Sequence, residues 1–372
     1  MKFLFIVQGE GRGHFTQAIT LEEMLLSHGH EVVEVLVGKS SSRTLPGFFN
    51  RNIKAPVKRF VSPNFLPTAE NKRVSMGKSV IYNLVKTPVY IQSMLYIKKR
   101  IEETQVDVVI NFYELLTGLT YAFLRPKVPY VCIGHQYLFL HEDFEFPHKS
   151  KLNISLLRFF TRLTSLGASK RLALSFRRMA DDEQRNISVI PPLLRREVMV
   201  LSPVLGDYIH GYMLNSGFAD SVIDYHTKHS NVNMQFFWDK SDAAEVTNVS
   251  NKLSFHQIND VKFLDYMAGC KAYASTAGFE SICEAMYLGK PVLMVPAHIE
   301  QDCNAYDAVQ AGAGISSDKF DLEQLLLFAE TYRPNPAFAY WVGSGEQLII
   351  DKLEENIDLH SIFTIPALSN YF

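Results

Sequence analysis

The first 40 residues alternate between apolar runs and a helical pattern, and this alternation restricts the chain to one class of fold. Residues 2–7 form a short, continuous apolar run, which is typical of a strand buried on both faces. A glycine-rich turn follows at residues 9–14, and residues 16–28 place apolar side chains at helical spacing. Residues 31–37 form a second apolar run. Because a strand, a crossover helix and a second strand build a parallel sheet, we expect an α/β fold.

The alternation continues and then restarts in the second half of the chain. The double proline Pro191–Pro192 interrupts it, because neither a helix interior nor a central strand accommodates two prolines. We therefore predict two doubly wound halves and a C-terminal helix and tail that packs back on the first half. The expected boundaries are 1–190 for the first half, 191–206 for the linker, 207–345 for the second half and 346–372 for the tail. Ligands of such sheets bind beyond the carboxyl ends of the strands, which places the expected site in the cleft between the halves.

Charge and cysteine content exclude several classes of protein. The chain has 39 acidic and 37 basic residues, and this balance argues against a dedicated nucleic-acid binder. The four cysteines have no CxxC spacing, so we expect reduced thiols rather than a disulfide framework or a zinc knuckle. No segment approaches the roughly 20 apolar residues of a membrane span, and residues 3–7 are too short for the apolar core of a signal peptide. We therefore expect a cytoplasmic protein.

The turn Gly9-x-Gly11-x-Gly13-His14 is the first candidate for chemistry. Glycines allow the backbone to approach a ligand closely, and the following helix N-terminus attracts negative charge. The spacing is neither that of a dinucleotide fingerprint nor that of a P-loop. His14 is expected at the rim of the cleft, where an imidazole can accept a proton from a substrate hydroxyl near neutral pH. The alternative is a histidine that caps its own helix.

Two further segments gather polar groups where a strand meets a helix. In residues 275–284, Gly278 and the Ser281 hydroxyl are placed to hold a pyrophosphate at the helix N-terminus. Glu284, one turn further on, is placed to accept hydrogen bonds from ribose hydroxyls. Residues 296–305 collect polar side chains suited to a polyhydroxyl ligand. The alternatives are an ordinary helix cap with a solvent-facing glutamate and a polar loop.

Residues 149–178 contain eight basic side chains and no acidic one, interleaved with apolar residues. A basic amphipathic stretch of this kind can lie on an anionic membrane surface. The alternative is a helix of the domain with a solvated basic face.

In their order and spacing, residues 275–284 and 296–305 resemble the donor-binding half of GT-B glycosyltransferases. More narrowly, they resemble the inverting group that includes the UDP-glycosyltransferases and the MurG-type N-acetylglucosaminyltransferases. The Gly-His pair after the first strand agrees with this resemblance. The residues that carry it are Ala277–Ala285, Leu288–Leu293, Pro296, Glu300-Gln301, Asn304-Ala305 and Gly312-Ala313-Gly314. The resemblance implies a GT-B fold, in which two Rossmann-like domains face each other across a cleft.

The resemblance also implies a role for each matched residue. His14 would be the base that deprotonates the acceptor hydroxyl. The residues implied at the donor phosphates are Gly11, Gly13, Ser216, Thr276, Gly278 and Ser281. Those implied for the rest of the donor are Glu284 at the ribose, Phe255, His256 and Gln257 at the nucleotide base, and Glu300 and Gln301 at the sugar.

The chain departs from the family pattern at two positions. Where relatives often have an aspartate that orients the catalytic histidine, this chain has Asn111, and Glu114 and His135 are the other candidates for that role. Where plant-type relatives have a histidine against the phosphates, this chain has Thr276, which leaves Arg12 as a candidate to balance their charge.

The resemblance implies an enzyme that transfers a sugar with inversion from a nucleotide diphosphate donor, expected to be UDP-linked, to an acceptor hydroxyl. Apart from this nucleotide-sugar co-substrate, it implies no bound cofactor and no obligatory metal. A glycan, a lipid or a small molecule would be the acceptor, and residues 149–178 would contact the inner face of a membrane peripherally. Two alternatives remain. One is a UDP-sugar 2-epimerase, and the other is an inactive sugar-nucleotide-binding accessory protein, which Asn111 favours.

Overall fold

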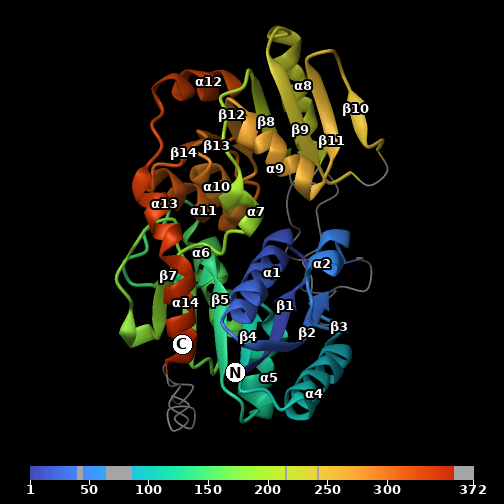
Figure 1. Ribbon diagram of the computed structural model, residues 1–372, viewed down its shortest axis with the longest axis vertical. Helices are drawn as coiled ribbons and strands as arrows, with labels where there is room; N and C mark the ends of the chain where they lie inside the picture. The colour runs from blue at the N-terminus through green and yellow to red at the C-terminus, as the bar shows by residue number, and fades with distance from the viewer. Residues whose placement is uncertain (40–44, 64–85, 214–215, 241–242, 356–372) are drawn as a thin grey trace.

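The computed structural model describes residues 1–39, 45–63, 86–213, 216–240 and 243–355. These residues form two seven-stranded sheets, one from each half of the chain. Helices cover both faces of the sheets, and the two Rossmann-like domains lie one above the other in Figure 1. The prediction of two doubly wound halves is therefore confirmed.

The first sheet has the strand order β3-β2-β1-β4-β5-β6-β7, and each pair of neighbouring strands is parallel. Its strands are β1 (Lys2–Gln8), β2 (Glu31–Lys39), β3 (Val57–Val61), β4 (Val108–Phe112), β5 (Tyr130–Gly134), β6 (Lys170–Leu174) and β7 (Ile187–Ile190). Its helices are α1 (Arg12–Ser27), α2 (Gly47–Asn52), α4 (Thr87–Thr104), α5 (Leu115–Leu124), η1 (His135–Leu140), α6 (Lys151–Thr164) and η2 (Glu183–Arg185).

The second sheet has the order β10-β11-β9-β8-β12-β13-β14, and only its β10–β11 pair is antiparallel. Its strands are β8 (Tyr208–Met213), β9 (Asn233–Trp238), β10 (Val246–Asn248), β11 (Leu253–Gln257), β12 (Ala272–Ser275), β13 (Val292–Met294) and β14 (Gly314–Ser316). The helices of this half are α7 (Arg196–Val200), η3 (Ser216–Phe218), α8 (Ala219–Lys228), α9 (Asp260–Gly269), α10 (Phe279–Tyr287), α11 (Ile299–Gln310), α12 (Leu322–Thr331), α13 (Pro336–Gly343) and α14 (Gly345–Glu354).

The apolar run at the start of the chain forms the central strand β1. Its residues Phe3–Val7 have no exposed side chain, because helices cover both faces of a parallel sheet. The helix that follows begins earlier than the apolar spacing predicted. Gly11 has an extended backbone and is the N-cap of α1, so Gly13 and His14 lie in its first turn instead of in a preceding loop.

The region 141–180 contains α6 and also strand β6, which pairs with β5 and β7 inside the first sheet. The strand starts with Lys170 and Arg171, so its apolar run is short. Its strand conformation depends on the two neighbouring strands, which a local pattern does not reveal.

The C-terminal helix α14 returns to the first domain and lies beside β7 (Figure 1). Lys352 Nζ pairs with Asp181 at 3.1 Å, and Glu354 pairs with His30 at 3.0 Å. The helix therefore ties the end of the described chain to the first sheet.

The part of the chain that the structure describes holds no helix with both the length and the apolar character needed to cross a membrane. All four cysteines are buried, free thiols.

Candidate functional site

The carboxyl ends of the two sheets face each other, and His14 lies between them. His14 is buried in the first turn of α1, immediately after β1. Its ring stacks on that of Tyr113, which follows β4, with 5.8 Å between ring centroids. The Tyr113 hydroxyl shares a hydrogen bond with Thr161 Oγ1 of α6 at 2.8 Å. Tyr113 therefore packs against one face of the histidine ring, and the hydrogen bond to α6 fixes the position of Tyr113.

Gln17, one turn further along α1, is the hydrogen-bond partner of the His14 ring. Its Oε1 lies 3.2 Å from His14 Nδ1. The Gln17 Nε2 group donates to Oε1 of Glu280, which belongs to α10 of the second domain. His14 is thus connected through one amide to a carboxyl group that is 263 positions from Gln17 in sequence.

Gly13 provides the space in which the Glu280 carboxyl group lies. A Cβ atom at Gly13 would overlap the carboxylate. The first turn of α1, expected to contact a phosphate through Gly11 and Gly13, therefore already faces a carboxyl group at Gly13. Gly11 is the N-cap of the helix, and a Cβ built there meets nothing within 4 Å.

Glu300, at the start of α11, is the second carboxyl group near His14. Its Oε1 accepts a hydrogen bond from Gln136 Nε2 of the first domain at 3.0 Å. The sequence predicted Glu300 as a ligand of the donor sugar and His14 as the base, and the structure brings the two together. Burial lowers the pKa of His14, an effect that the Gln17 hydrogen bond and the Glu300 charge oppose only in part. The imidazole is consequently neutral near pH 7.

The three residues predicted as candidates to orient His14 have other partners. The Asn111 side-chain amide donates to backbone oxygens of Glu114 and Thr164, so it fixes the turn between β4 and α5. Glu114 is the N-cap of α5 and accepts from Ser62 Oγ at 2.5 Å. Burial raises its pKa to about 7.

The third candidate, His135, lies against the second domain. Its ring stacks on Phe279 at 4.1 Å, and its Nδ1 lies 2.7 Å from the backbone oxygen of Leu174. Its Nε2 is 4.0 Å from Asp307 Oδ2 of α11. Burial lowers the pKa of His135 to about 4 and raises that of Asp307 to about 6.

The turn between β12 and α10 leads into a helix N-terminus without a side-chain cap. Gly278 is the N-cap of α10, and the Ser281 hydroxyl donates to its backbone oxygen at 3.2 Å. Ala277 has a φ of 58°, a left-handed conformation that is strained for a residue with a Cβ. Thr276 is fully buried just before it. Ser216 starts η3, but its side chain lies outside the described residues.

Glu284, predicted at the ribose, forms a buried ion pair with the linker. Arg195 Nε donates to Glu284 Oε1 at 2.7 Å. Desolvation lowers the pKa of Arg195, but the charge of Glu284 and its hydrogen bond contribute to a net increase in this pKa. A carboxylate has about four lone-pair sites, so this contact leaves Glu284 able to accept further hydrogen bonds.

The segment predicted to hold the nucleotide base lies on β11. Phe255 is buried and stacks on Trp238, whereas His256 Nε2 shares a 2.7 Å hydrogen bond with Gln235. Gln257 donates to the backbone oxygen of Ala243. These side chains are held by the second domain itself, and the backbone of the strand pairs with β9 on one side and β10 on the other.

Two other predicted residues stabilise the polar loops around the site. Gln301 is buried, and its Oε1 accepts from the backbone nitrogen of Ala297 at 2.9 Å. Arg12, the candidate counter-charge for a phosphate, pairs with Asp260 of α9 at 2.6 Å. Among the described residues, no group of three or more histidine, cysteine, aspartate and glutamate side chains is arranged to hold a metal ion.

Sequence reasoning missed four residues that contact the predicted ones: Gln17, Tyr113, Glu280 and Arg195. The sequence offered one indication for Gln17: it lies three positions after His14, and residues three apart on a helix share a face. Glu280 lies inside the segment that carries the family resemblance, but its direction toward the first domain depends on how the domains pack.

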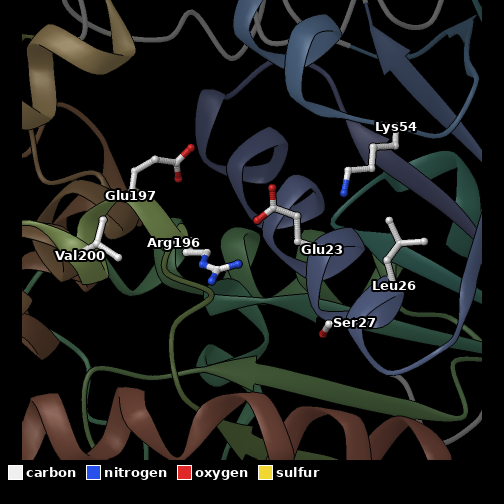
Figure 2. A pocket seen from close by; sticks show the side chains of 7 residues that line it. All are labelled: Glu23, Leu26, Ser27, Lys54, Arg196, Glu197 and Val200. Atoms are coloured by element: carbon white, nitrogen blue, oxygen red, sulfur yellow. The ribbon is translucent and has the colours of Figure 1, made fainter.

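A cavity of about 630 Å³ lies beside the linker, near the other end of α1. Its walls come from α1, from Lys54 and from α7, and Figure 2 shows Glu23 and Arg196 extending toward each other from two sides. Glu23 lies nine positions after His14 on α1, or roughly 14 Å along the helix at 1.5 Å per residue. The cavity is therefore separate from the His14 site.

Comparisons with known proteins agree with this arrangement. The family model described as Glycosyl transferase family 1 matches residues 1–331. No curated protein matches the chain. Among solved structures, UDP-GlcNAc 2-epimerase from Neisseria meningitidis, bound to UDP-GlcNAc, has a TM-score of 0.63 at 14% identity and covers 96% of this chain and 100% of its own.

Two solved glycosyltransferases share the same architecture with similar TM-scores and sequence identities. UGT2 from Phytolacca americana, complexed with UDP-2fluoro-glucose and pterostilbene, has a TM-score of 0.59 at 13% identity and covers 100% of this chain and 98% of its own. SnogD from Streptomyces nogalater has a TM-score of 0.56 at 16% identity and covers 94% and 99%. At these identities the similarity establishes the fold, and the family model establishes the family. The protein thus belongs to glycosyl transferase family 1 and is a glycosyltransferase with the GT-B fold.

Proposed function

We propose that this glycosyltransferase moves a sugar from a UDP-linked donor to an acceptor hydroxyl with inversion, and that His14 is the base. The observation that carries the proposal is the setting of His14: it is buried, burial lowers its pKa, and its Nδ1 faces the Gln17 amide oxygen. Because an amide oxygen only accepts, Nδ1 carries the proton and Nε2 carries the lone pair. A neutral imidazole of this tautomer can take the acceptor proton through Nε2.

The turn before α10 would hold the donor diphosphate. Backbone N–H groups at the helix N-terminus, together with the hydroxyls of Thr276 and Ser281, would surround the phosphates. Their partial positive charge would stabilise the negative charge that develops on the leaving diphosphate. Gly13 would not contact the phosphates, because the Glu280 carboxyl group already lies beside it.

The remaining donor contacts follow the predicted residues. Glu284, held by Arg195, would accept hydrogen bonds from the ribose hydroxyls. The nucleotide base would lie beside the backbone of residues 255–257. Glu300 and Gln301 would contact the sugar hydroxyls, with Glu300 close enough to His14 to affect its pKa. This arrangement would place the anomeric carbon between the base and the diphosphate, as a single in-line displacement requires.

Closure of the two domains would assemble the site. The pairs Arg12–Asp260, Gln17–Glu280 and Gln136–Glu300 each join the first domain to the second. Closing an active site expels water, which protects the donor from hydrolysis.

The exposed face of α6 supports a further proposal, that the enzyme contacts an anionic membrane peripherally. Leu152 and Phe159 are 68% and 49% exposed, and Lys151 and Arg162 are exposed beside them. Three of the other bases of residues 149–178 form ion pairs within the protein, namely Lys149, Lys170 and Arg177. The proposed contact therefore rests on α6 itself. The buried side of the same helix holds Tyr113 through Thr161, so α6 adjoins the His14 site.

Nucleotide binding tests the donor site first. Thermal unfolding would be followed with UDP, dTDP, GDP, ADP or CMP, each with and without EDTA. A ligand at 100 times its Kd stabilises the folded state by about 2.7 kcal/mol, which produces a measurable shift. We expect a selective shift with UDP that EDTA leaves unchanged. No shift with any of the nucleotides would contradict the proposed donor site.

Turnover tests the base and the reaction type. UDP-sugars would be incubated alone and with a panel of glycan, lipid and small-molecule acceptors. Release of UDP that requires an acceptor supports transfer, whereas a change of the donor sugar without acceptor would indicate epimerisation. His14→Ala should lower turnover by roughly 10²–10⁴-fold with little change in UDP affinity. Equal turnover in the variant would remove His14 from the role of base.

A further inference from the structure

A chain of two hydrogen bonds connects Glu280 of the second domain to His14 of the first. The Gln17 amide lies between them, with Nε2 donating to Glu280 Oε1 and Oε1 facing His14 Nδ1. All three side chains lie at the junction of α1 and α10, where His14 and Gln17 are buried and Glu280 is half-buried. Nothing in the sequence places them together, because α10 follows α1 by more than 250 residues.

The two ends of the Gln17 amide are chemically different, and this difference has a consequence. An ionised carboxylate only accepts hydrogen bonds, so Glu280 must face the Gln17 NH₂ group. The amide oxygen must then face His14 Nδ1, which can only be a donor to it. The charge on Glu280 therefore determines, through one amide, which ring nitrogen of His14 carries the proton.

We propose that Glu280 is a positioning residue that selects, through Gln17, the His14 tautomer whose Nε2 is free to accept a proton. This inference rests on the proposed role of His14 as the base. It also means that the first domain alone does not set the tautomer. The second domain supplies the carboxyl group, so the base is prepared only when the domains meet.

The surroundings of Glu280 bring its ionisation close to physiological pH. Burial and the charges of Glu284 on α10 and Glu300 on α11 raise its pKa to about 7, while the Gln17 hydrogen bond lowers it. From α1, it faces the neutral His14 through Gln17, and its carboxylate lies at Gly13. Below that pH, a protonated Glu280 can donate to the amide oxygen of Gln17. The amide can then reverse and donate to Nδ1, which moves the ring proton to Nε2.

The tautomer can be measured without any substrate. The full-length protein would be labelled with ¹⁵N-histidine, and two-bond ¹H–¹⁵N correlations would distinguish the two neutral forms. The signals of His14 would be identified by their loss in His14→Gln. In the wild type, we expect the form protonated at Nδ1 to predominate at pH 8.5 and to fall at least several-fold by pH 6. In Glu280→Gln, which keeps the size of the side chain, we expect no change over this range.

Identical pH profiles in the wild type and Glu280→Gln would overturn the proposal. Glu280→Ala provides a second variant, and its His14 should also lose the pH response. Glu346→Gln is the matched control, because Glu346 contacts the far end of α1 through Ser27 and not His14. Its profile should match that of the wild type, and loss of the response there would also overturn the proposal.

The same variants separate this inference from the proposed function. If His14→Ala retains full turnover while the wild-type tautomer still follows Glu280, the assignment of the base fails and the hydrogen-bond chain stands. If His14→Ala is inactive while Glu280→Gln has a wild-type tautomer profile, the base stands and the role of Glu280 fails. With an active UDP-sugar and acceptor pair, Glu280→Ala should lower kcat by about 10²-fold, as expected for a displaced catalytic group, with little change in KM for the donor.

Discussion

Gly13 shows how one missing side chain permits contact between the two domains. It lies in the first turn of α1, where alanine would ordinarily be favoured over glycine by about 1 kcal/mol. The Glu280 carboxylate lies where its Cβ would be. Alanine at this position would displace the Glu280 side chain, so glycine is favoured here by packing and not by backbone conformation.

Gly13→Ala should consequently destabilise the protein by about 1–3 kcal/mol, the usual cost of overpacking. In a Glu280→Ala background the same substitution should be neutral or stabilising, because the overlapping group is gone. Thermal unfolding of the two single variants and the double variant measures both effects. An equal effect of Gly13→Ala in the two backgrounds would contradict the contact.

At the scale of elements, α10 connects three parts of the molecule. Its N-terminus follows the strained turn at Ala277, Glu280 reaches α1, and Glu284 holds Arg195 of the linker. The two glutamates are four positions apart and so share one side of the helix. A ligand at the N-terminus of α10 would therefore affect the contacts of this helix with the linker and with the first domain.

Glu284→Ala should weaken UDP binding by about 1.5–3 kcal/mol, because it removes a charged hydrogen-bond acceptor from the ribose. Isothermal titration with UDP measures the change. Arg195→Met is the control, since it removes the ion pair but leaves Glu284 in place. An equal loss in both variants would assign the effect to the ion pair, and unchanged affinity in Glu284→Ala would contradict a ribose contact.

The exposed apolar face of α6 gives a second test at this scale. The double variant Leu152→Ser/Phe159→Ser should bind anionic vesicles several-fold more weakly than the wild type, because buried apolar area contributes to interfacial binding. Co-sedimentation with phosphatidylglycerol vesicles measures it, and neutral vesicles serve as the reference. The control Leu327→Ser removes an equally exposed apolar side chain from α12, where 61% of Leu327 is exposed. If the wild type does not pellet with anionic vesicles at low salt, α6 has no such role.

At the scale of the whole molecule, buried acids make stability depend on pH. Glu114 is fully buried at the N-cap of α5, and its pKa is raised from 4.5 to about 7. Between these two values the folded state binds more protons than the unfolded state. The free energy of unfolding therefore decreases as pH rises through this range and is highest, for this group, below it.

Glu114→Gln should remove this dependence. Relative to the variant, the wild type should lose up to about 3 kcal/mol of stability between pH 5 and pH 8, since one pKa unit corresponds to 1.36 kcal/mol. Denaturant unfolding of both proteins at several pH values measures the difference. Glu323→Gln, at an exposed position of α12, is the control. A constant difference between the wild type and Glu114→Gln at all pH values would contradict the raised pKa.

The sequence by itself was enough to determine the class of fold. The apolar runs and glycine turns are local patterns, and they predicted β1, β2 and the division into two halves, because strand and helix periodicity follows from nearby residues. The segment from Ala277 to Gly314 was enough to indicate the family that its model match confirms. The strands β6 and β7 at the edge of the first sheet were harder to predict from the sequence, because they are short and depend on neighbouring strands for pairing.

Only the tertiary structure decided what His14 contacts. Asn111, one of the three candidate partners, bonds instead to backbone oxygens of its own domain, and His14 is bonded to Gln17, which is bonded in turn to Glu280. Glu284 likewise proved to be paired with the linker. The physical reason is that these hydrogen bonds join segments far apart in the chain, and their geometry arises from the packing of two domains. A local sequence pattern carries the conformation of each segment, whereas the partner of a buried polar group is set by whichever segment the fold brings within 3 Å of it.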